Sequence, residues 1–288
     1  MRKNMRSLRL ENLEGRSLMA GDVFASMKLG SLKIEGDSQA NDISVVDLGG
    51  GQVEITGQNE TKVNGLAKVT LNGFVANVKV ELKGGDDTVK WQGIESHVPL
   101  RFAIETGSGN DTVFVDKLYA GIGKIESGLG NDVVEVLNAK AAILDIETGG
   151  GDDIVRIGSP TVASSVSVLK LDIETGSGND QVQIQNSNLN STWLKVELGS
   201  GDDKAVVSKL SGSSALNLSG GFGTDAVVVE DSTFRSMDIE LGAGDGDDLK
   251  VSGVKSLRTK LSGGLGVADK LTMAGSDLGS LKTSGFEA

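Results

Sequence analysis

The stretch RFAIETGSGNDTVFV at residues 101–115 decides how this chain folds. It joins two short runs of alternating apolar residues through a glycine-rich turn. The first run contains Phe102 and Ile104, and the second contains Val113 and Val115. Alternation with a period of two is typical of β-strands that bury one face. The stretch therefore predicts a strand, a tight turn and a second strand.

The same unit recurs along the chain. Close copies are LDIETGGGDDIVRI from Leu144 and LDIETGSGNDQVQI from Leu171. Looser and weaker copies begin at Val78, Gly123, Leu194, Leu216, Met237 and Thr259. The last Asp of each turn marks steps of 21 to 27 residues, with a mean of about 23. Such a repeat cannot bury its apolar face alone, whereas stacked copies bury a continuous core.

We therefore expect an all-β fold, a parallel β-helix or β-roll-like solenoid with about 22-residue coils, in which equivalent residues form columns. The alternative is an antiparallel meander whose copies pair as hairpins. The near-identical turn at one fixed phase favours the coil. We divide the chain into an export or sorting segment at residues 1–20, degenerate coils or a cap at 21–77, and a β-solenoid repeat domain at 78–288.

Composition excludes several classes of protein. The 288 residues include 41 Gly but only 2 Pro, and no three-residue Gly period is present, which excludes collagen. No Cys and a single His exclude disulfide scaffolds, thiolate sites and His clusters. A net charge of −12 argues against nucleic acid as a partner, and no apolar run reaches the ~18 residues of a membrane helix. Because acidic residues recur in every coil and no pair is distinguished, we expect no catalysis.

The recurring turn reads Gly-x-Gly-(Asn/Asp)-Asp-x-Val. It resembles the haemolysin-type (RTX-like) calcium-binding repeat, whose nonapeptide is GGxGxDxUx. The resemblance implies Ca²⁺ as the bound ion, with one column of sites because only one such turn occurs per coil. The residues it marks as metal ligands are Asp86, Asp87, Asn110, Asp111, Asn131, Asp132, Asp152, Asp153, Asn179, Asp180, Asp202, Asp203 and Asp247.

The chemistry of the turn fits a cation. Glycines leave backbone carbonyl oxygens free, and Ca²⁺ takes six to eight oxygen ligands. Two adjacent turns together offer carboxylates and carbonyls. The competing interpretation is an ordinary tight turn in which Asp and Asn accept local backbone hydrogen bonds. The copies at Asp225 and Asp269 follow Thr224 and Ala268 instead of an acid or amide, so we expect those two to be structural turns.

Two further features need an interpretation. A Glu recurs six residues before most turn aspartates, at Glu81, Glu105, Glu126, Glu147, Glu174 and Glu197. We expect this column to be a solvated face, with a second cation surface as the alternative. The two tryptophans, Trp91 and Trp193, fall on different coils, and we expect them to pack against the core rather than to form a sugar platform.

The first twenty residues differ from the rest. Residues 13–19, LEGRSLM, resemble the LEPR-XLL-type N-terminal motif of planctomycete exported proteins, with Gly15 in place of the motif's Pro. The resemblance implies export or cell-surface sorting. The alternative is a basic amphipathic helix that caps the first coil.

Together these features predict a secreted or cell-surface calcium-binding solenoid with a structural or adhesive role. Its expected partners are calcium ions and extracellular matrix or cell-surface polysaccharide. Two alternatives stay open: a carbohydrate-binding or polysaccharide-active β-helix protein, and a metal-free structural solenoid.

Overall fold

The computed structural model describes residues 21–73, 75–95, 98–159, 166–189, 193–212 and 214–287. Residues 1–20, on which the export prediction rests, lie outside the described residues. Within the described ranges no helix has the length and apolar character needed to span a membrane.

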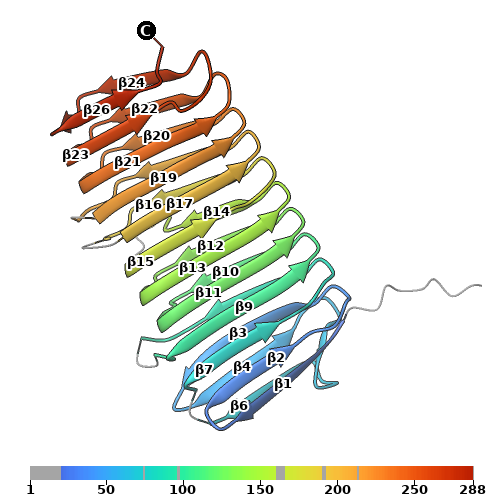
Figure 1. Ribbon diagram of the computed structural model, residues 1–288. Coiled ribbons are helices and arrows are strands. Elements are labelled where there is room, and N and C mark those ends of the chain that lie inside the picture. The colour runs from blue at the N-terminus through green and yellow to red at the C-terminus, as the bar shows by residue number, and fades with distance from the viewer. Residues whose placement is uncertain are drawn as a thin grey trace, which may run out of the picture.

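The described chain is an all-β parallel solenoid, which confirms the predicted fold class. It makes about nine turns, roughly 22 residues apart. Each coil contributes one strand to each of two sheets that face one another (Figure 1). The core lies between the sheets, so the coil is flattened rather than triangular.

The first sheet has 14 strands among the described residues. They are β1 (Asp22–Lys28), β2 (Ser31–Glu35), β5 (Lys62–Val63), β7 (Asn77–Glu81), β9 (Arg101–Ser108), β11 (Tyr119–Leu129), β13 (Lys140–Gly150), β15 (Ser167–Glu174), β17 (Trp193–Ser200), β19 (Ser214–Phe222), β21 (Thr233–Ala243), β23 (Lys255–Ser262), β25 (Asp277–Leu278) and β26 (Leu281–Ser284).

The second sheet has 12 described strands. They are β3 (Asp42–Gly49), β4 (Gln52–Gly57), β6 (Lys68–Asn72), β8 (Thr88–Gln92), β10 (Thr112–Asp116), β12 (Val133–Leu137), β14 (Ile154–Ile157), β16 (Gln181–Gln185), β18 (Lys204–Ser208), β20 (Ala226–Glu230), β22 (Asp248–Ser252) and β24 (Lys270–Ala274).

The repeat sets the register between coils. Val113 pairs with Val134, which pairs in turn with Val155. Every second residue faces inward, so like residues stack into aliphatic columns that water does not reach. Burial of each such Val or Ile stabilises the fold by about 1.5–3 kcal/mol. A one-residue slip would turn the whole set outward, which fixes the register strongly.

The N-terminal end departs from the repeat. β2 and β3 stack directly on β7 and β8, so they form a coil of their own within the segment 21–77, where we expected degenerate coils or a cap. The residues between this coil and β7 add further strands. β4 pairs antiparallel with β3 and β6 pairs antiparallel with β4, which extends the second sheet, and β1 lies antiparallel on β2. These added strands pair the backbone groups of the first coil, which would otherwise form an open sheet edge.

The two edges of the solenoid differ. At one edge β9, β11 and β13 run into the Gly-Asp turns, toward which their arrowheads point (Figure 1). At the other edge the chain turns through residues in the left-handed conformation, such as Lys117 (φ 58°) and Asn138 (φ 49°). The Gly-Asp turns therefore form one column along one edge.

Candidate functional site

Close stacking of the coils explains the two glycines of each turn. Gly107 and Gly109 have φ values of 108° and 129°, a region that L side chains rarely adopt. A Cβ placed on Gly128 would collide with the carbonyl oxygen of Gly107 in the preceding coil, and one on Gly130 would collide with that of Gly109. The backbones of successive turns thus lie directly against one another.

The last Asp of each turn points inward. Its Oδ1 accepts a hydrogen bond from the backbone N–H of the equivalent Asp in the preceding coil. The Asp111 N–H donates to Asp132 Oδ1 at 2.8 Å, and the Asp132 N–H donates to Asp153 Oδ1 at 2.8 Å. We call this set the inner column. It comprises Asn41, Asp87, Asp111, Asp132, Asp153, Asp180, Asp203, Asp225, Asp247 and Asp269.

The second carboxyl oxygen of each inner-column aspartate lacks a partner. All nine Oδ2 atoms are shielded from water and accept no hydrogen bond from the described residues. A buried carboxylate oxygen without a donor is costly, because water has been removed and nothing replaces it. The column therefore needs a proton or a cation along its length.

Burial shifts the acidity of these groups. Loss of water raises the pKa of Asp87 and Asp225 to about 7 and that of Asp132 to about 6, and neighbouring aspartates add to the effect. The pKa values of Asp153 and Asp203 rise to about 6 for the same reason. The pKa values of Asp111, Asp180 and Asp247 are also raised by burial. Several inner carboxyls thus titrate near neutral pH.

A column of hydroxyls lies beside the central aspartates. Thr106, Ser127, Thr148 and Thr175 each hold down the pKa of the Asp five residues later. Each hydroxyl also has a carbonyl oxygen of the next coil within hydrogen-bond distance. Thr106 Oγ1 donates to the Ser127 carbonyl at 3.1 Å, and Thr175 Oγ1 donates to the Leu198 carbonyl at 2.7 Å. Since a hydroxyl has one proton, it serves either the carbonyl or the carboxylate, and Asp87, Asp203, Asp225, Asp247 and Asp269 have no hydroxyl residue five positions earlier.

The residue before each inner aspartate points outward and forms a second ladder. Asn110 Oδ1 accepts the Asn131 N–H at 2.9 Å, and Asn131 Oδ1 accepts the Asp152 N–H at 2.8 Å. The bond runs from the following coil, opposite in direction to that of the inner column. We call this exposed set the outer column. It comprises Asp86, Asn110, Asn131, Asp152, Asn179, Asp202, Thr224 and Asp245.

The fold thus separates the two residues of each pair that we predicted to bind the metal together. Each predicted pair, such as Asn131 and Asp132, places one member at the surface and the other in the interior. Sequence reasoning missed Asp245, whose Oδ1 accepts the Val267 N–H at 3.0 Å. The signal was the extra residue in that turn, which moves the outward position from Gly246 to Asp245.

The two turns that we expected to be only structural, those of Asp225 and Asp269, have the same inner-column hydrogen bond as the other turns. Asp225 Oδ1 accepts the Asp203 N–H at 3.0 Å, and Asp269 Oδ1 accepts the Asp247 N–H at 3.1 Å. Both belong to the inner column. The preceding residues that differ in these copies are exposed, and Thr224 occupies the outer position. The inner position is therefore independent of its neighbour.

Backbone oxygens complete the set of donors at this edge. Within the described ranges no donor reaches the carbonyl oxygen of the second turn glycine, as at Gly109, Gly130 and Gly151. No three acidic or His side chains of the described residues gather where they could hold one metal ion. A cation at this edge would therefore draw on carbonyl oxygens as well as on carboxylates.

The glutamates of the outward column form ion pairs with lysines. Lys79 Nζ lies 2.6 Å from Glu81 of its own coil and 3.3 Å from Glu105 of the next. Lys124 bridges Glu126 and Glu147 in the same way, at 2.7 and 3.2 Å. These half-exposed pairs contribute little stability each. They do supply the counter-charge that this face needs.

Comparison with known proteins gives no relative. No family model, no curated protein and no solved structure matches the chain significantly.

Proposed function

We propose that this protein is a secreted, non-catalytic structural solenoid whose Gly-Asp edge binds Ca²⁺. The observation that carries the proposal is the inner column: nine buried aspartates whose Oδ2 atoms accept no hydrogen bond from any of the described residues. A divalent cation between successive coils would neutralise two such carboxylates at once.

The donor chemistry suits calcium better than other metals. The edge offers only oxygen: the Oδ2 atoms of the inner aspartates and the free carbonyl oxygens of the second turn glycines. Hard oxygen donors in a flexible arrangement are what Ca²⁺ prefers, whereas Zn²⁺ prefers nitrogen and sulfur. The Oδ2 atoms of Asp132 and Asp153 would be the carboxylate ligands between their two coils.

Calcium binding would be coupled to folding. The stack brings buried carboxylates together at strand spacing, about 4.8 Å. Two unit charges at that distance repel by about 3 kcal/mol at an effective dielectric of 20. A cation that binds only the folded stack removes this repulsion and stabilises the fold by mass action. Together with the export-type motif at residues 13–19, this supports a protein that matures outside the cell, where it serves a structural or adhesive role.

Calcium titration followed by circular dichroism and thermal melting tests the proposal. The triple variant D111N/D132N/D153N keeps each side-chain oxygen that accepts the backbone N–H and removes the three charges. The matched control N110A/N131A/D152A alters the outer column of the same coils. We expect Ca²⁺ to raise the melting temperature of the wild type and the control, and to raise that of the inner triple variant much less. An unchanged melting temperature and spectrum at saturating Ca²⁺ in the wild type would overturn the proposal.

The metal-free structural solenoid is the second candidate. It is favoured by the ladder of Oδ1 bonds, which makes the inner aspartates useful without any ion, and by pKa values near neutrality, which allow protonation. This candidate predicts that D111N/D132N/D153N is more stable than the wild type at pH 8, with or without Ca²⁺. The calcium proposal predicts that the wild type is the more stable of the two once Ca²⁺ is added.

A further inference from the structure

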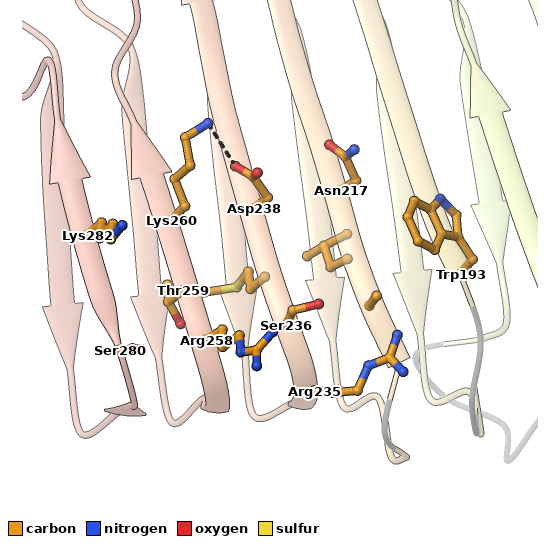
Figure 2. Close-up of a pocket in the computed structure, with 13 residues that line it drawn as sticks. Trp193, Asn217, Arg235, Ser236, Asp238, Arg258, Thr259, Lys260, Ser280 and Lys282 are labelled. Atoms are coloured by element: carbon orange, nitrogen blue, oxygen red, sulfur yellow. Dashed lines mark ion pairs between the residues drawn. The ribbon is translucent and has the colours of Figure 1, made fainter.

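A groove far from the Gly-Asp turns opens on the outer face of the first sheet, near its C-terminal end. It has a volume of about 470 Å³ and crosses β17, β19, β21, β23 and the end strand β26. Figure 2 shows Trp193 at one end, Arg258 and Lys260 further along, and Asn217 and Arg235 between them. This volume falls in the range of ligand sites.

Side-chain size explains the hollow. One outward position of successive coils reads Trp193, Ala215, Ser236 and Arg258, each paired with the next. Two small residues therefore lie between two large ones. Because neighbouring strands are about 4.8 Å apart, Trp193 and Arg258 stand about 14 Å from one another across this floor.

The cations of the groove lack the partners that cations have elsewhere on this face. In the earlier coils each Glu of the outward column pairs with a lysine, as Glu105 does with Lys79. Toward the C-terminal end Ser219, Ser262 and Ser284 occupy that Glu position, and Glu240 alone keeps it among these four coils. Because the other acids are missing, the neighbouring basic residues have fewer carboxylates with which to form ion pairs.

Within the described residues, Arg235, Arg258 and Lys282 make no ion pair, and Lys260 has only Asp238, at 3.3 Å. The groove thus holds four cations and one acid in a protein whose net charge is −12. Such a concentration of one sign against the charge of the whole chain attracts a ligand of the opposite sign.

Trp193 adds an aromatic platform. Its side chain is 53% exposed, whereas Trp91 is 3% exposed and packs edge-on against Phe102 with ring centroids 4.9 Å apart. The sequence expectation of core packing is therefore confirmed for Trp91 and wrong for Trp193. An exposed indole offers a large rigid apolar surface at small entropic cost to a ligand that stacks on it.

We infer that this groove binds an acidic polysaccharide. A pyranose ring presents an apolar C–H face to Trp193, and its carboxylate or sulfate groups reach the guanidinium groups of Arg235 and Arg258, which bind planar anions through paired hydrogen bonds. The groove is open and follows the sheet from coil to coil, so an extended chain passes along it. Nucleic acid is disfavoured because Trp193 is the one aromatic residue among the described residues that line the groove, whereas proteins that bind single strands stack successive bases on several aromatic side chains.

Calorimetric titration of the full chain tests the inference with three probes: an oligogalacturonide, dextran sulfate and neutral dextran. The first two separate carboxylate from sulfate recognition. Saturating Ca²⁺ and EDTA conditions are compared, so that a failure of calcium binding is seen separately. We expect at least one anionic glycan to bind, neutral dextran not to bind, and the affinity to fall as salt rises.

Variants assign the binding to the groove. Trp193→Ala and Arg258→Ala should each weaken glycan binding by about tenfold or more, as expected for central aromatic and Arg contacts. Lys250→Ala is the matched control, since Lys250 is an exposed cation on β22 of the opposite sheet; it should change affinity by less than about twofold. Circular dichroism checks that each variant is folded. The inference is overturned if neither anionic glycan binds, if both groove variants bind like the wild type, or if a single-stranded oligonucleotide binds as tightly.

Discussion

The two columns of the Gly-Asp edge arise from adjacent residues and yet occupy opposite environments. In the inner column Asp132 is buried and accepts a hydrogen bond from the preceding coil. In the outer column Asn131 is exposed and accepts one from the following coil. Both columns pair the backbone of the turns, where the strands have ended. They hold neighbouring coils together from both directions.

The residue types of the two columns differ accordingly. The outer column mixes Asp, Asn and Thr, because water can replace any acceptor that a side chain lacks. No two acids are adjacent among its members from Asp86 to Thr224. The inner column is aspartate in every coil after Asn41. Like charge is therefore avoided at the surface and concentrated in the interior, where only a proton or a cation can relieve it.

The largest expected effect is the response of the calcium-free protein to pH. The inner carboxyls have raised pKa values, to about 7 for Asp87 and Asp225, whereas unfolded Asp titrates near 3.8. The folded state therefore binds more protons between these values, and its stability rises as the pH falls. In EDTA we expect the melting temperature to increase by about 10 °C from pH 8 to pH 5.

The control for this prediction is D111N/D132N/D153N, whose pH dependence should be flatter. With saturating Ca²⁺ the trend should reverse, because protons then displace the ion. A melting temperature in EDTA that is constant or falls over this range would show that the inner column is not a set of strained carboxylates.

The next effect concerns the turn that separates the columns. Gly128→Ala should destabilise the protein by about 3 kcal/mol, because φ is 105° there and the new Cβ would collide with the Gly107 carbonyl. Gly150, the middle residue of the next turn, is the control: its Cβ would lie 3.1 Å from the flexible Ser177 hydroxyl and at ordinary van der Waals distance, 3.5 Å, from Leu129. Chemical denaturation measures both. Equal losses would contradict this account of the coil contact.

Removal of one acceptor compares the columns directly. At pH 5, Asp132→Ala should cost about 2 kcal/mol, because the buried Asp111 N–H loses the one acceptor it has in the described part of the chain. Asn131→Ala should cost less than about 1 kcal/mol, because water replaces the lost bond to the Asp152 N–H. Urea denaturation of the two variants gives the difference. A larger loss at Asn131 would reverse the assignment of inner and outer roles.

The smallest effect is expected from a charge added to the outer column. Asn131→Asp keeps the acceptor and places a carboxylate next to Asp152. Solvent screens exposed charges, so the change in unfolding free energy should stay below about 0.5 kcal/mol. Thermal melting in low and high salt measures it. A loss of several kcal/mol would mean that the outer column is less exposed to water than its position indicates.

Much of this fold follows from the repeat alone. The alternation around Ile104 and Val113 predicts two strands, and recurrence of the GSGND turn at one phase predicts parallel coils with the turns along one edge. The same pattern identifies the inner aspartates, although it could not say that Asn110 and Asp111 would be divided between surface and interior. That division depends on which way successive turns stack, which is a contact between residues 21 or more apart.

The sequence by itself determined the coil, its length and the column of acids, because a short repeat with period-two alternation has few ways to bury its apolar face. The tertiary structure alone decided which carboxyl oxygens are left without partners, which lysines neutralise the Glu column, and where small residues open a groove beside Trp193. These are properties of neighbouring coils rather than of neighbouring residues. They arise only when backbones some 5 Å apart place side chains from different repeats in contact.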